Sequence, residues 1–277
     1  MQERAELIML SDIAGYVGAD TCGCLLAIRQ DQQEEISLMI DIGTNGEMVL
    51  GNRERMVTCS TAAGPAFEGA KIECGMRGAA GAVDHVKYED GKWNYTTVGN
   101  KPAVGLCGSG LIDLVAGLLD AGMLDENGVL RSGQEKQGIF ILVPPERGGN
   151  ERGVYLTQKD LGEVQLAKAA IAAGIQMLME RLGITEDDIC SVYIAGAFGN
   201  YMDPVSAGKI GLLPATLVKK VKPVGNAAGE GAKIALVNEK EMLEMDELVR
   251  KIEFVELAAS ADFQDHFIDE LGFETGE

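Results

Sequence analysis

Glycine turns that directly follow apolar segments are the feature of this sequence that most constrains its fold. The chain contains 36 glycines among 277 residues, whereas an average protein has about 7% glycine, and they cluster at the ends of apolar runs. Three such turns lie in Asp41–Glu47, Leu106–Gly110 and Ile194–Asn200. Glycine has no side chain to block an approaching ligand and adopts backbone conformations that other residues avoid. The pattern therefore predicts loops that approach a ligand closely.

The apolar segments between these turns predict alternating strands and helices. Strands are expected over 6–10, 37–42, 47–51, 56–60, 82–88, 93–98, 140–143, 189–195 and 220–224, and helices over 17–29, 108–122 and 160–182, with a small-residue helix ending at 237. This order indicates an α/β fold with a mixed sheet flanked by helices. The clearest helix, 160–182, has an apolar stripe, and Thr157 with Asp160 resembles a capping box at its start.

The charge of the chain narrows the classes of partner. The 43 acidic and 24 basic residues give a formal net charge of −19, which argues against non-specific binding to nucleic acid or to anionic membranes. The segment 239–277 holds 13 acidic and 3 basic residues. We expect it to form a solvated helical face, with a docking surface for a basic partner as the alternative. No apolar run reaches the ~18 residues that span a bilayer.

The cysteines indicate a reducing environment. Six cysteines are too few for a disulfide scaffold, and their spacing contains neither C-x-x-C nor an iron–sulfur run. Cys22 and Cys24, separated by Gly23, are expected to be small packing residues of a helix. The N-terminal segment is acidic and does not resemble a signal peptide. These features predict a cytoplasmic protein.

The first glycine turn offers groups that suit a phosphate. Successive backbone N–H groups around Gly43 could surround an anion, and Thr44 and Asn45 add side-chain donors. Asp41, which precedes the turn, could hold a water of a magnesium ion. A plain hairpin with an Asn-Gly turn is the alternative interpretation.

The other two turns offer weaker signals. Gly108 and Ser109 open a helix, whose N-terminus can bind an anion, although these residues taken alone favour a tight entry to an apolar helix. Gly196, Ala197 and Phe198 follow a buried strand, and such a turn lets a flat ring lie against the backbone.

Other catalytic arrangements are not indicated. The sequence contains neither the P-loop motif G-x-x-x-x-G-K-[ST] nor a Rossmann G-x-G-x-x-G placed after a strand. His85 and His266 are the only histidines, and their separation favours structural or solvent-facing roles. Ser60 and Ser109 lack the His and Asp partners that hydrolase chemistry needs.

The combined turns resemble those of a known superfamily. D-I-G-T-N-G-E is similar to a phosphate loop of the actin-like ATPases, and I-A-G-A-F-G-N-Y to their adenosine loop. The closer resemblance is to the C-terminal actin-like (ASKHA, ribonuclease H-like) domain of reductive activators of corrinoid proteins. Five motifs occur in that family's order, at Ile13–Thr21, Ile40–Glu47, Ser60–Ala70, Leu106–Asp113 and Ile194–Gly199.

The resemblance implies an activity and a set of partners. Such activators use ATP to drive an electron from an N-terminal [2Fe–2S] ferredoxin domain onto Co(II) corrinoid, giving the Co(I) that methyltransferases need. This chain lacks ferredoxin cysteines, so the cluster is expected only in an upstream domain. One D-I-G-T-type loop is present where the superfamily uses two, so 1–35 is expected to end a first actin-like lobe and 36–277 to form the second. ATP, Mg²⁺, a corrinoid protein of a methyltransferase system and a homodimer are implied.

The resemblance also implies residue roles. Gly43, Thr44 and Asn45 would hold phosphates beside a metal at Asp41, Gly108 and Ser109 would lie near the nucleotide, and Gly196, Ala197 and Phe198 would flank the adenosine. Asp20 could position water or magnesium, with helix capping as the alternative. Glu68 is a weaker candidate of the same kind.

Two other functions remain open on the sequence. One is a non-catalytic module for dimerisation and docking of a corrinoid protein, because only one phosphate loop is present. The other is a small-molecule kinase of the actin-like superfamily, although no residues in the sequence indicate a pocket for a phosphate-accepting substrate.

Overall fold

A six-stranded mixed sheet forms the centre of the molecule in the computed structural model, which describes residues 9–131 and 138–273. The strands are β1 (Ile36–Ile42), β2 (Gly46–Gly51), β3 (Met56–Thr61), β4 (Ala82–Glu89), β5 (Lys92–Thr97), β6 (Gly105–Leu106), β7 (Ile139–Val143), β8 (Val154–Thr157), β9 (Ile189–Ala195), β10 (Val221–Gly225) and β11 (Ile252–Phe254). The helices are α1 (Ala19–Ile28), α2 (Gly108–Asp120), α3 (Gln158–Leu182), α4 (Gly196–Gly199), α5 (Pro204–Lys209), α6 (Ala227–Val237), α7 (Glu239–Val249) and α8 (Ala261–Asp269).

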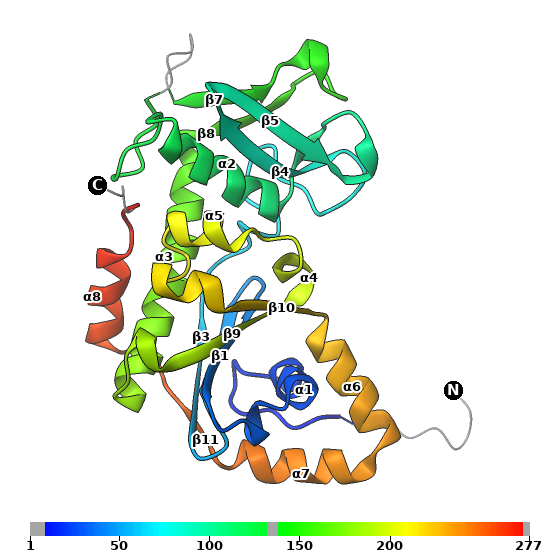
Figure 1. The fold of residues 1–277 in the computed structure, drawn as a ribbon, viewed down its shortest axis with the longest axis vertical. Helices are drawn as coiled ribbons and strands as arrows, with labels where there is room; N and C mark the ends of the chain where they lie inside the picture. The colour runs from blue at the N-terminus through cyan, green and yellow to red at the C-terminus, as the bar shows by residue number, and fades with distance from the viewer. Residues whose placement is uncertain (1–8, 132–137, 274–277) are drawn as a thin grey trace.

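The order of the central sheet is β10-β9-β1-β2-β3-β11. β1, β2 and β3 form an antiparallel meander, whereas β9 runs parallel to β1, and β10 runs parallel to β9. The chain between β3 and α3 builds a second body, which contains the sheet β5-β4-β6, the hairpin β7-β8 and the helix α2. Figure 1 shows this second body above the central sheet, with α5 between them.

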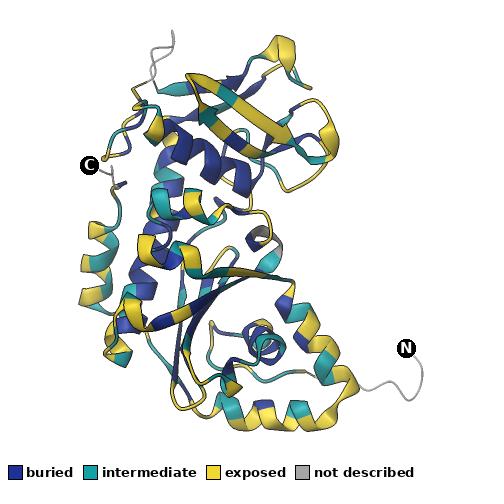
Figure 2. Ribbon diagram, viewed as in Figure 1, coloured by how far each residue is buried: buried dark blue, intermediate teal, exposed yellow. Residues whose placement is uncertain are grey.

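Helices cover both faces of the central sheet, as the alternation of buried side chains requires. On one face, Met39 and Val49 pack in a cluster with residues of α1, α6 and α7. On the other face, Leu38 and Met48 pack in the large core with residues of α3. Figure 2 shows β1, β3, β9 and α3 mostly buried, and α6, α7 and α8 exposed on their outer sides. The layers are therefore helix, sheet and helix, which confirms the predicted fold class.

Most predicted elements are found within a residue or two of their expected bounds. The capping box of α3 is present, because the Thr157 hydroxyl accepts the Asp160 N–H (3.2 Å) and the Asp160 carboxylate accepts the Thr157 N–H (2.9 Å). Gly23 lies against α6, where an added Cβ would be 2.7 Å from the Ala228 carbonyl oxygen. This contact confirms the packing role predicted for the Cys22–Cys24 segment.

Some predicted elements differ from the structure. The strand expected over 6–10 falls mostly outside the described residues, and Met9 and Leu10 are not in a strand. The acidic segment forms the helices α7 and α8, as expected, but β11 lies between them and pairs with β3. A three-residue strand has too short a pattern to be recognised in a sequence. The described helices include none that is both long and apolar enough to cross a membrane.

Candidate nucleotide-binding site

Three parallel strands end side by side at one edge of the central sheet, and each has a glycine as its last residue or directly after it. In the register of the sheet, Asp41 of β1 pairs with Ala195 of β9, and Ala195 pairs with Gly225 of β10. Gly43 and Gly196 come directly after β1 and β9. Ligands of α/β sheets bind at the carboxyl ends of the parallel strands. The structure therefore brings two of the three predicted glycine turns together, and adds a third turn at Gly225.

The turn after β1 presents its backbone to solvent. Thr44 and Asn45 are exposed at the tip of the β1–β2 hairpin, and the Gly43 N–H donates to the Asn45 carbonyl (2.9 Å). Among the described residues, the N–H groups of Thr44 and Asn45 have no recorded acceptor. Two free N–H groups beside an exposed hydroxyl and amide form an arrangement that can bind a phosphate.

The loop after β3 closes over this hairpin. The Gly64 N–H donates to the Thr44 carbonyl (2.8 Å), and the Thr44 hydroxyl donates to a carboxylate oxygen of Glu68 (2.5 Å). Glu68 is therefore adjacent to the predicted phosphate donors. The sequence indicated Glu68 only weakly, because its contact with Thr44 spans 24 positions and depends on the path of the loop.

The turn after β9 forms one side of the same site. Gly196 has a φ of +87° and starts the short helix α4. A Cβ atom at Gly196 would lie 2.9 Å from Oδ1 of Asp41. The absence of a side chain therefore keeps the space beside Asp41 open. The backbone of Ala197 and Phe198 continues α4, whereas the placement of their side chains lies outside what the structure describes.

Asp41 belongs to a group of acidic side chains. Burial and the negative charge of Asp20 raise the pKa of Asp41, while a contact with the Cys24 thiol (3.9 Å) lowers it. Burial also raises the pKa of Glu47, and the negative charges of Asp20 and Asp41 raise it further. Glu47 is the cross-strand partner of Asp41 and accepts a hydrogen bond from the Ser60 hydroxyl (3.2 Å). The three carboxylates repel one another, so a bound cation would stabilise all of them.

Glu47 is a residue that the sequence reasoning missed. In an antiparallel hairpin, directly opposed residues lie on the same face. Because Asp41 and Glu47 are opposed across the turn, counting outward from the turn could have identified Glu47. Asp20, by contrast, lies in the first turn of α1 and accepts the Thr21 N–H (2.9 Å), while the N-cap of α1 is Gly18. Asp20 is therefore not the N-cap of this helix.

The carboxylates would fit a magnesium ion only if a phosphate ligand supplied most of its coordination. Among the described residues, no group of three or more His, Cys, Asp or Glu side chains is arranged to hold a metal ion by itself. Mg²⁺ usually keeps several waters and binds through one or two carboxylates and the phosphates of its ligand. Asp41, half-buried beside the open turn, is suited to that limited role.

The predicted pair at the start of α2 has other contacts. The Ser109 hydroxyl is buried and donates to the Asp84 carbonyl of β4 (2.8 Å). Gly110, next in the helix, lies so close to β4 that an added Cβ would be 2.2 Å from the Val83 carbonyl oxygen. These contacts explain the G-S-G sequence by packing, and the nucleotide role of Gly108 and Ser109 stays a prediction.

The fold and the glycine turns together define an actin-like (ASKHA) domain. A family model described as the C-terminal domain of RACo, the ASKHA domain, matches residues 35–277. The chain belongs to this family.

Individual proteins of this kind are also similar. A corrinoid activation enzyme, RamQ, from Eubacterium limosum is 38% identical over 271 residues, which cover 92% of this chain and 45% of that protein. A [Co(II) methylated amine-specific corrinoid protein] reductase from Methanosarcina barkeri is 30% identical, over 98% of this chain and 52% of that protein. A solved structure of a reductive activator for a corrinoid, iron-sulfur protein superposes with a TM-score of 0.89 at 40% identity, covering 95% of this chain and 44% of the other. The chain spans about half the length of these relatives.

Proposed function

We propose that this chain binds Mg·ATP at the edge where β1, β9 and β10 end, and that it serves the ATP-dependent reduction of Co(II) corrinoid to Co(I) on a corrinoid methyl-transfer protein. The observation that carries the proposal is that β1, β9 and β10 end in register, with Ala195 between Asp41 and Gly225, and that Gly196 lies directly against Asp41. The relatives support it, since their names describe corrinoid activation and corrinoid protein reduction.

Each part of the site has a proposed task. The N–H groups of Thr44 and Asn45 would hold phosphate oxygens, and Asp41 would hold a water of the magnesium ion. The open backbone at Gly196 would lie against the adenosine. The ATP-bound and the ADP-bound protein would favour different conformations, because each nucleotide binds one conformation better than the other. The residues around the nucleotide, among them Glu68 at the Thr44 hydroxyl, would couple that conformational difference to a docked corrinoid protein in the cytoplasm.

We also propose that the chain forms a homodimer, which light scattering of the purified chain would test.

Calorimetric titration of Mg·ATP and Mg·ADP into this chain tests the proposal. We expect saturable binding that weakens at least tenfold in Asp41→Asn, a substitution that keeps the shape of the side chain. Asp31→Asn is the matched control, because burial also raises the pKa of Asp31. Asp31 precedes the N-terminal end of β1 and is therefore remote from the proposed site, which lies at the other end of the strand. Equal nucleotide affinity in wild type and Asp41→Asn would contradict the proposed site.

Two further outcomes would identify the alternative functions. Capture of a corrinoid protein that is unaffected by nucleotide would support a docking module. Consumption of ATP only when a sugar or carboxylate is added would support a small-molecule kinase.

A further inference from the structure

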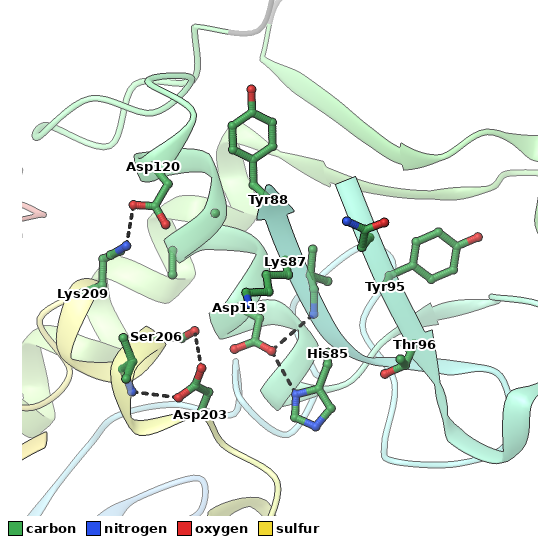
Figure 3. Close-up of a pocket in the computed structure, with 15 residues that line it drawn as sticks. His85, Lys87, Tyr88, Tyr95, Thr96, Asp113, Asp120, Asp203, Ser206 and Lys209 are labelled. Atoms are coloured by element: carbon green, nitrogen blue, oxygen red, sulfur yellow. Dashed lines mark hydrogen bonds and ion pairs between the residues drawn. The ribbon is translucent and has the colours of Figure 1, made fainter. Parts of the chain in front are cut away.

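A cleft of about 530 Å³ opens between the β4–β5 hairpin, α2 and α5. None of the nucleotide turns at Gly43, Gly196 or Gly225 lines it. Figure 3 shows the residues that do, with Asp113 of α2 between His85 of β4 and Ser206 of α5. A cleft of this size can hold a small molecule or a large side chain.

The deepest polar group of the cleft lacks one hydrogen-bond partner. Asp113 is only 4% exposed, and its Oδ2 lies 3.1 Å from Nδ1 of His85 and accepts the Val86 N–H (3.3 Å). Its Oδ1 is buried without a partner. Burial raises the pKa of Asp113, and a hydrogen bond from the nearby Ser206 hydroxyl partly offsets this, although the same hydroxyl also donates to Asp203 (3.5 Å). A buried acceptor without a donor is costly, so this oxygen indicates a group that binds from outside.

The charged side chains around the cleft indicate the sign of the charge on a ligand that would bind there. Lys87 is paired with Glu89 (2.6 Å), and Lys209 is paired with Asp120. Asp203 caps α5, because its Oδ1 accepts the Val205 N–H (2.9 Å). Both lysines of the cleft are thus already paired with carboxylates, whereas His85, which is half-exposed, is the only basic side chain paired with Asp113 among the described residues. The charge that lacks a counter-ion is negative.

The walls of the cleft suit a flat group. Ala116 and Gly117 are the small residues of α2 that line it, and Tyr95 of β5, another lining residue, is 39% exposed. The neighbouring Tyr88 is held by Trp93, with 4.8 Å between ring centroids. Aromatic rings attract cations that lie over their faces.

We propose that this cleft binds a guanidinium group, with a nitrogen donor on Oδ1 of Asp113. A guanidinium presents several donors in one plane and stacks on tyrosine rings, whereas an ammonium offers a compact point charge that suits the flat space less well. A hydrolytic triad does not explain the cluster, because Asp113 lies between His85 and Ser206 and the histidine does not touch the serine. This inference is independent of the proposed nucleotide site.

The two histidines of the chain allow a direct test in solution. The ring signals of His85 and His266 can be followed by proton NMR while N-acetylarginine amide or free arginine is added. His85 contacts Asp113, whereas His266 pairs with Glu180 (2.9 Å) between α8 and α3 and serves as the internal control. We expect saturable shifts of the His85 signals and none of the His266 signals. Tighter binding of the blocked amide would assign the group to an arginine of a partner protein, and tighter binding of free arginine to a small molecule.

Variants make the assignment specific. We expect Asp113→Asn to weaken binding at least tenfold and Tyr95→Ala, at an exposed site, to weaken it severalfold. Asp90→Asn, at the tip of the same hairpin and with a φ of +50° that asparagine tolerates, should bind as wild type does. Equal shifts with N-acetyllysine amide or with sodium chloride would overturn the proposal. Adenosine that shifts His85 while both guanidinium probes fail would also overturn it and would assign the cleft to a nucleoside.

Discussion

A Cβ atom placed on Gly196 would lie 2.9 Å from Oδ1 of Asp41, although 155 positions separate the two residues. The pairing of β1 with β9 creates this proximity, because Asp41 and Ala195 are register partners. The glycine after one strand thus determines how much space is left beside the carboxylate at the end of the other.

Gly196→Ala should therefore weaken nucleotide binding by at least tenfold. The added methyl group reaches Asp41, and alanine is strained at a φ of +87°. Gly183→Ala separates the backbone strain from the loss of space beside Asp41. Gly183 also has a positive φ, +69°, but nothing lies within 4 Å of an added Cβ there. Both variants should lose about 1 kcal/mol of stability, but only Gly196→Ala should lose affinity in calorimetry. Equal affinities in the two variants would argue against a ligand at this turn.

Local sequence patterns predicted much of the fold. Apolar runs that end in glycine gave the strands β1 and β9, and Thr157 with Asp160 marked the start of α3, because each signal lies within a few residues. The proximity of Asp20 to Asp41 could not be predicted, since it arises from the packing of α1 on the sheet face. The contacts of Asp113 with His85 also depend on tertiary structure, because 28 positions separate them.

Asp41→Asn should stabilise the protein at neutral pH. Burial and Asp20 raise the pKa of Asp41 in the folded state. A raised pKa gives a stability contribution that is fully present below the unfolded value, about 3.9, and is lost as the pH rises through the folded value. The ionised Asp41 therefore destabilises the fold at pH 7, and asparagine removes this effect. Urea denaturation should show the variant more stable than wild type at pH 7 and nearly equal near pH 3.

Asp188→Asn should show the opposite sign in the same experiment. Hydrogen bonds from Thr185 lower the pKa of Asp188, so its contribution is present above the unfolded pKa and is lost as the pH falls through the folded pKa. This variant should be less stable than wild type at pH 7, with a smaller difference in acid. A loss of stability in Asp41→Asn at pH 7 would instead mean that the ionised Asp41 has a favourable partner.

Asp160→Ala should cost about 2–4 kcal/mol of stability. Asp160 is fully buried, and its carboxylate accepts the Thr157 N–H (2.9 Å), the Thr157 hydroxyl (2.8 Å) and the Glu73 N–H (2.9 Å). The side chain thus caps α3 and fixes the loop before β4. Asp188→Ala is the control, since its capping box with Thr185 is exposed, and we expect a much smaller loss there in urea denaturation. Similar losses would show that burial and the link to Glu73 contribute little.

Gly231→Ala should destabilise the protein, although alanine usually favours helices. A Cβ at Gly231 of α6 would lie 1.9 Å from the Gly23 carbonyl oxygen of α1, so the two helices would have to separate. We expect a loss of about 1–3 kcal/mol in urea denaturation.

Gly162→Ala, inside α3, supplies the comparison, because nothing lies within 4 Å of its added Cβ. It should gain about 0.5–1 kcal/mol from helix propensity. Since α1 carries Asp20 and α6 follows the turn at Gly225, Gly231→Ala should also weaken nucleotide binding, whereas Gly162→Ala should leave it unchanged. If Gly231→Ala gained stability as Gly162→Ala does, α1 and α6 would not be packed as closely as the structure shows.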